Sequence, residues 1–189
     1  MALLNRLFCK FDNLCEQYGV YKVHTLGDIY VIMGYSGKVS KEKRTVEDAT
    51  QEAYATLQVG IQMTEIVMEE RSKLKDPLLR NLNIKIGIHV GKINGCIIGT
   101  KVARYDIFGQ DVLISRLILK QGSPGQVVTS ENFRHMIRRK AFIYDTLDWQ
   151  SFGEVNLADQ DLRIKTHTVE QIFAENDSSF DMNEVEFGN

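Results

Sequence analysis

The stretch "KVHTLGDIYVIMG", Lys22 to Gly34, constrains the fold most, because Gly27 and Asp28 interrupt a run suited to a buried β-strand. The residues on both sides are mostly β-branched, aromatic or aliphatic, as is typical of strands. Glycine readily adopts the left-handed backbone that tight turns require. The stretch therefore predicts two strands joined by a turn that carries Asp28. Aspartate is common at turns, where it bonds its own backbone, so the residue has an ordinary structural explanation beside any functional one.

Helical patterns flank this predicted hairpin. Apolar residues recur at helical spacing after Leu3 and predict an amphipathic helix that ends near Gly19. Thr45, with Asp48 three residues later, resembles a capping box, so a second helix is predicted to start there and to run to about Arg71.

The remaining segments alternate between strand and helix patterns. "LNIKIGIHVG" alternates as a strand, "INGCIIG" is interpreted as its hairpin partner, and "RYDIFG" holds a third short strand. Further elements are predicted as a helix over 110–120 that ends at Gly122, strands around Val127, Phe142 and Ile164, and a helix near 132–139. Helices interleaved with hairpins favour an α+β sheet with helices on one face over a doubly wound parallel sheet.

Composition narrows the class of protein. The 189 residues suffice for one domain with a proper core, and the net charge of −2 gives no electrostatic case for nucleic acid or an anionic membrane as the main partner. Three cysteines, Cys9, Cys15 and Cys96, have mostly apolar neighbours and are expected to be reduced core thiols in a cytoplasmic protein. No apolar run approaches the roughly 20 residues of a membrane-spanning helix, although a membrane-anchored parent protein remains open.

The last residues differ in composition from the rest. Segment 174–189, "AENDSSFDMNEVEFGN", holds five acids and no lysine or arginine. Such a segment is expected to be a disordered acidic tail, which leaves 1–173 as the folded domain.

Three segments in register resemble the class III nucleotidyl cyclase catalytic domain. They are "FDNLCEQYGVYKVHTLGDIYVIMG", "LNIKIGIHVGKINGCIIGTKVARYDIFGQDV" and "GSPGQVVTS". The loop after Gly34, the loop around Pro77 and "DVLI" look most like the large protist cyclases that carry two such domains in one membrane protein. The resemblance implies a ferredoxin-like βαββαβ-type fold, here without the family's first strand, and an intracellular signalling role.

The resemblance gives two residues a function. In the family, the aspartate of this Gly-Asp turn, here Asp28, is one of two carboxylates that hold two Mg²⁺ (or Mn²⁺) ions over the α-phosphate of ATP or GTP. Mg²⁺ takes one or two protein carboxylates together with phosphate and water, which suits that position. A basic residue just after the "GIHxG" motif touches the nucleotide's phosphates, and here that residue is Lys92. An exposed lysine at a hairpin turn is an equally good interpretation of Lys92.

Departures from the family pattern limit what the chain can do alone. The positions of the ribose-orienting asparagine and the transition-state arginine hold Leu113 and Leu117, and Arg116 is one residue, or about 100° of helix, away. The other metal-binding aspartate is expected on a strand before the first helix, and a late Lys-x-Gly-Lys pattern has no counterpart. Such a chain resembles the metal-supplying half of an asymmetric dimer. It is expected to be inactive without a complementary half.

Other polar residues receive no catalytic role. His24 and Asp106 stand at base-recognition positions, but in a metal-supplying half they would line the second, vestigial pocket, and GTP and ATP remain open as substrates. His24 is expected to be buried and satisfied, His89 to be structural, and Gly91 and Gly95 to form turns.

Two functions of different class remain open: a cyclase half, and a catalytically inactive cyclase-like domain that dimerises and regulates. An upstream Asp followed by Ile-x-Gly-Phe within about thirty residues would complete the metal pair and favour the enzyme. Its absence would favour the regulatory module.

Overall fold

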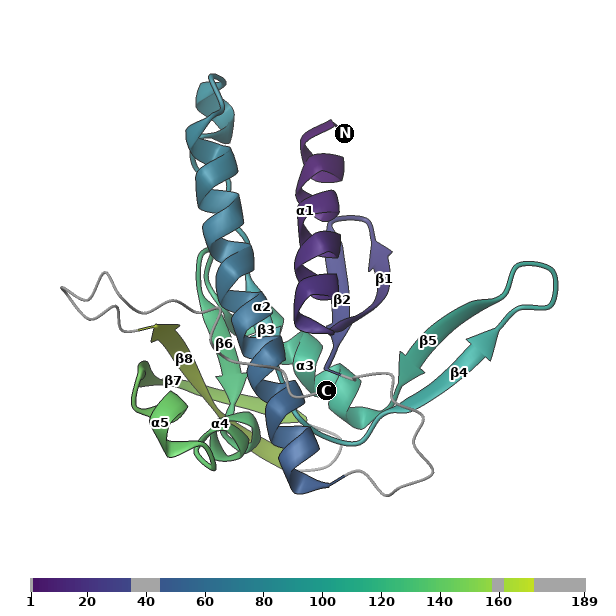
Figure 1. Ribbon diagram of the computed structural model, residues 1–189, viewed down its shortest axis with the longest axis vertical. Coiled ribbons are helices and arrows are strands. Elements are labelled where there is room, and N and C mark those ends of the chain that lie inside the picture. The colour runs from purple at the N-terminus through teal and green to yellow at the C-terminus, as the bar shows by residue number, and fades with distance from the viewer. Residues whose placement is uncertain (1, 35–44, 158–161, 172–189) are drawn as a thin grey trace.

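The computed structural model describes residues 2–34, 45–157 and 162–171, and Figure 1 shows the arrangement of its elements. The helices are α1 (Ala2–Tyr18), α2 (Val46–Ser72), a 3-10 turn η1 (Pro77–Leu79), α3 (Gln110–Gln121), α4 (Glu131–Ile137) and α5 (Ala141–Tyr144). The strands are β1 (Tyr21–Leu26), β2 (Ile29–Met33), β3 (Ile86–Ile88), β4 (Asn94–Ile98), β5 (Arg104–Phe108), β6 (Val127–Ser130), β7 (Leu147–Leu157) and β8 (Leu162–Gln171). None of the described helices is long and apolar enough to cross a bilayer. The basic loop 35–44 and the acidic tail lie outside the described residues.

The strands form one four-stranded sheet and two separate hairpins. The sheet has the order β3-β6-β8-β7, in which β3 and β6 are parallel and the other pairs are antiparallel. The hairpins are β1–β2 and β4–β5. A mixed sheet with helices confirms the α+β class.

The predicted pairing of the strands around residues 86 and 96 is wrong. β3 pairs with β6 across a crossover that includes α3, whereas β4 pairs with β5. β3 has helices on both of its faces and lies at one end of the four-stranded sheet, where its hydrogen-bonding partner is β6. All residues of β4 are exposed, and local alternation could not distinguish these two environments.

Helices cover both faces of the four-stranded sheet, so the expected placement on one face is also wrong. On one face, a Cβ at Gly60 of α2 would lie 3.3 Å from the side chain of Ile88. On the other face, a Cβ at Gly87 would lie 2.5 Å from the backbone of Leu119 in α3. The helices α2 and α3 therefore sandwich β3, and only the glycine allows α3 to approach so closely.

The two long helices start and pack as the sequence indicates. The Thr45 hydroxyl accepts the Asp48 N–H at 3.1 Å, and the Asp48 carboxylate accepts the Thr45 N–H at 2.8 Å, which confirms the capping box. α1 packs against α2 and the β1–β2 hairpin through a core of buried residues, which includes Phe11, Leu14 and Val59.

Three local predictions are wrong. Phe142 lies in the short helix α5, because the backbone bonds of residues 143–145 return to residues 140 and 141 and close helical turns. Cys15 is buried as expected, but Cys9 and Cys96 are exposed, since they lie on the outer side of α1 and on β4. Gly95 lies inside β4 rather than in a turn, and there a Cβ would overlap the Tyr105 ring.

Candidate functional site

Asp28 lies at the tip of a tight hairpin. Leu26 pairs with Ile29, and Gly27 adopts a φ of +63°, which favours glycine, so the predicted turn is confirmed. Asp28 is exposed, and no described residue forms a hydrogen bond or ion pair with it. A carboxylate that is held on a short turn and has no partner among the described residues fits a hard-oxygen ligand for magnesium.

Lys92 lies in the connection between β3 and β4. It is exposed, and its backbone N–H donates to the Asp111 carboxylate at 2.7 Å. No hydrogen bond or ion pair joins Lys92 to Asp28 within the described ranges. Nor do three or more His, Cys, Asp or Glu side chains gather around one metal position there.

His89 has partners that the sequence did not indicate. Its side chain is 2% exposed, with Nδ1 2.7 Å from the Ser130 hydroxyl and Nε2 2.9 Å from the Asp111 carboxylate. The structural interpretation of His89 stands, but Asp111 was missed. A buried histidine at the end of a strand requires polar partners, and an acid in the first turn of a neighbouring helix was the available signal.

His24 and Asp106 meet between β1 and β5. His24 Nδ1 lies 3.2 Å from Asp106 Oδ1 but without hydrogen-bond geometry, and Arg104 approaches the other carboxylate oxygen at 3.2 Å. His24 is half-buried, so the expectation of a buried and satisfied ring is only partly met. His24 belongs to the same hairpin as Asp28, but among the described residues no hydrogen bond or ion pair joins this cluster to Asp28.

The two positions on α3 at which the family has asparagine and arginine carry leucine side chains in different surroundings. Leu113 is 54% exposed at the start of the helix. Leu117 is half-buried and packs against the core beneath α3, while Arg116 is exposed. Neither leucine can donate a hydrogen bond to a ribose or a phosphate.

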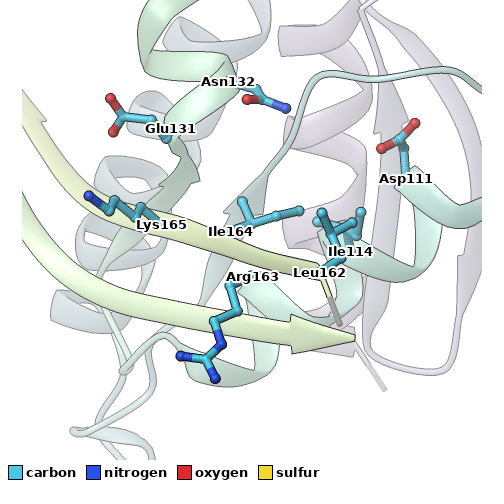
Figure 2. A pocket seen from close by; sticks show the side chains of 8 residues that line it. All are labelled: Asp111, Ile114, Glu131, Asn132, Leu162, Arg163, Ile164 and Lys165. Carbon is cyan, nitrogen blue, oxygen red and sulfur yellow. The ribbon is translucent and has the colours of Figure 1, made fainter. Parts of the chain in front are cut away.

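A pocket of about 360 Å³ opens beside the start of α3 and the strand β8. Figure 2 shows the Asp111 carboxylate at one end and Glu131 with Lys165 at the other. Because the lining carries charges of both signs, the pocket does not by itself select a charged ligand. Asp111 links it to the turn that carries Lys92.

The fold is an α+β domain that carries an exposed carboxylate on the β1–β2 turn and an exposed lysine after β3. Residues 1–171 match the adenylate and guanylate cyclase catalytic domain family, and the chain belongs to that family.

A curated relative supports this assignment, and solved structures share the fold. The chain is 37% identical over 139 residues to guanylate cyclase alpha of Plasmodium falciparum (isolate 3D7), an alignment that covers 72% of this chain and 3% of the relative. The guanylate cyclase domain of RhGC from Catenaria anguillulae in complex with GTP superposes with a TM-score of 0.69 at 20% identity, over 92% of this chain and 84% of that one. The non-canonical dimeric guanylyl cyclase domain of RhoGC from Blastocladiella emersonii gives 0.66 at 20% identity, over 90% and 83%.

The chain corresponds to a small part of its curated relatives. It spans 3% to 5% of the length of the Plasmodium and Toxoplasma guanylate cyclases that it matches.

Proposed function

We propose that this chain is the metal-supplying half of a nucleotidyl cyclase that converts GTP or ATP to a cyclic nucleotide and pyrophosphate. The observation that carries the proposal is the contrast between Asp28, free on its turn, and the leucines at positions 113 and 117. The chain keeps the metal-ligand position, Asp28, but lacks the asparagine and arginine functions. That division of residues is what one half of an asymmetric pair requires.

In this proposal Asp28 binds Mg²⁺ or Mn²⁺ together with the nucleotide's phosphates. Bound magnesium supplies charge that stabilises the phosphates and makes the attacking 3′-hydroxyl more acidic. The hairpin turn keeps the Asp28 carboxylate in place. Lys92 adds a cation toward the phosphates, and a compact ammonium on a flexible stem suits that contact.

The complementary half is a second cyclase domain that supplies the asparagine and the arginine. The β4–β5 hairpin extends away from the body of the molecule (Figure 1). Its exposed apolar side chains, with those of the start of α3, are Ile93, Ile97, Ile98, Val102, Phe108 and Leu113. A group of exposed apolar side chains of this kind indicates a protein interface.

The sheet also supports the expected additional strand with the second aspartate. In the described part of the chain β3 has a pairing partner on one side only, and the β1–β2 hairpin forms a sheet of its own. An unpaired edge accepts a further strand. A strand beside β3 would bring a carboxylate on it into the neighbourhood of the same sheet.

A regulatory module is the second candidate. The same leucines favour it, because neither can supply the asparagine or the arginine function. In that case the domain would bind its partner without contributing to the reaction.

Reconstitution distinguishes the two. The chain alone, with Mg²⁺ or Mn²⁺ and either GTP or ATP, should form no cyclic nucleotide above background. Mixed with a cyclase domain that carries the asparagine and arginine, it should do so. A mixture that assembles but stays inactive with Mn²⁺ would favour the regulatory module, and turnover by the chain alone would contradict the assignment of a half-site.

A further inference from the structure

The Asp111 carboxylate connects three parts of the chain. It projects from the first turn of α3, where Oδ1 lies 2.9 Å from His89 Nε2 and Oδ2 accepts the Lys92 N–H at 2.7 Å. Both oxygens are therefore used outside the helix that carries them. A charged acceptor makes each of these hydrogen bonds stronger than a neutral one would be.

His89 holds one oxygen of the Asp111 carboxylate and is itself held by Ser130. With the proton on Nε2, the ring donates to Asp111, and Nδ1 accepts the Ser130 hydroxyl at 2.7 Å. The Ser130 oxygen in turn accepts the Phe133 N–H at the start of α4. His89 and Ser130 are buried, and both ring nitrogens and the hydroxyl have partners, so the part of the network behind Asp111 is held in one arrangement.

Gly91 lets the carboxylate come this close to the backbone. A Cβ on Gly91 would lie 2.1 Å from Cγ of Asp111. Because His89 and the Lys92 N–H hold the carboxylate on both oxygens, it could not move aside without losing one of these bonds. The position requires glycine because of this close approach. The backbone conformation is not the reason, since Gly91 is not one of the glycines with a positive φ.

We infer that Asp111 and His89 are positioning residues, which fix the backbone at Gly91 and Lys92 and so aim the Lys92 side chain at the phosphates of the nucleotide. The inference rests on the proposed function for its last step. An acid in the first turn also interacts favourably with a helix dipole. The interaction with the helix dipole needs no contact with Lys92. An experiment can therefore separate it from the positioning of the Lys92 backbone.

The first test measures amide hydrogen exchange at Lys92 in the free chain. Asp111→Ala should remove protection from that amide, while Asp111→Asn should keep it, because the amide oxygen still accepts the bond. The double variant Gln110→Asp, Asp111→Ala returns an acid to the first turn of α3 without the contact. Lost protection in both alanine-containing variants supports the inference, and protection that persists in Asp111→Ala, or that Gln110→Asp restores, overturns it.

The second test measures kcat/KM in the assembly with the complementary half. Asp111→Ala should lower it about tenfold or more in the unsubstituted background, because small misplacements of a binding group are costly. The same change should have little effect in a Lys92→Ala background, and Gly91→Ala should resemble Asp111→Ala. An equal loss in both backgrounds, or full activity of Asp111→Ala, contradicts the inference. If the unsubstituted assembly makes no cyclic nucleotide, the proposed function fails, and the exchange experiment still decides whether Asp111 holds the turn.

Discussion

The carboxylate of Glu70 in α2 lies 2.6 Å from the guanidinium of Arg6 in α1, and its side chain is only 4% exposed. Lys10 approaches the same carboxylate at 2.9 Å and Lys73 at 3.1 Å. Glu70 therefore holds three cations between the two long helices. Removal of Glu70 would leave these three cations without the carboxylate that they share.

The first prediction concerns pH. Hydrogen bonds from Lys10 and Lys73 lower the pKa of Glu70 from 4.5 to about 2. Because the folded state binds the proton more weakly than the unfolded chain does, the stabilisation is present above about pH 4.5 and is lost as the pH falls toward 2. Urea unfolding between pH 7 and 2 should show this loss, and Glu70→Gln should be less stable at pH 7 with a flatter pH dependence. An unchanged pH dependence in Glu70→Gln would rule out this contribution.

The second prediction concerns the contact between β3 and α3. Gly87→Ala places a Cβ 2.5 Å from the Leu119 backbone, so the helix must shift, and the free energy of unfolding should fall by about 2 kcal/mol or more. Gly153→Ala is the matched control. Its Cβ would meet only the end of the Gln121 side chain, so we expect a change within about 0.5 kcal/mol. Equal effects in urea unfolding would contradict the close packing of α3 on β3.

The third prediction concerns the β4–β5 hairpin. Ile97 is 74% exposed, so Ile97→Asp should leave the stability of the free chain nearly unchanged but weaken its binding to the complementary half at least tenfold. Phe142, which is 73% exposed on α5, provides a control of similar exposure outside the proposed interface. Analytical ultracentrifugation of the mixtures measures both effects. Weaker assembly with Phe142→Asp than with Ile97→Asp would place the interface elsewhere.

The sequence predicted best where the determining interactions are local. The hairpin at Gly27 and the cap at Thr45 depend on residues within four positions of one another, and both are as predicted. The pairing of β3 could not be predicted in this way, because its partner β6 lies about forty residues away and is selected by packing between α2 and α3.

The candidate site follows the same rule. The roles of Asp28 and Lys92 were predicted from short motifs that resemble the cyclase family, and they remain predictions. Asp111 was missed because its role depends on contacts with His89 and Lys92, which are 22 and 19 residues away in the chain. The position of Asp28 relative to Lys92 likewise depends on how the β1–β2 hairpin and the β3–β4 connection pack in the fold.

We propose Asp28 as a metal ligand of the cyclase reaction. Asp28→Asn keeps the size of the side chain but removes one charge from a site that binds divalent cations. In the assembly with the complementary half, we expect the rate to fall by about a hundredfold or more, or roughly 3 kcal/mol of transition-state stabilisation, with folding nearly unchanged. Arg116→Ala is the control, because that side chain is exposed and one residue from the required position.

The most direct measurement is therefore the rate of cyclic nucleotide formation by assemblies that contain Asp28→Asn or Arg116→Ala, each compared with the unsubstituted chain at saturating Mg²⁺. The expected result is a loss of about a hundredfold or more for Asp28→Asn and little change for Arg116→Ala. Near-full activity of Asp28→Asn together with loss of activity in Arg116→Ala would contradict it, and would make this chain the half that supplies the transition-state cation.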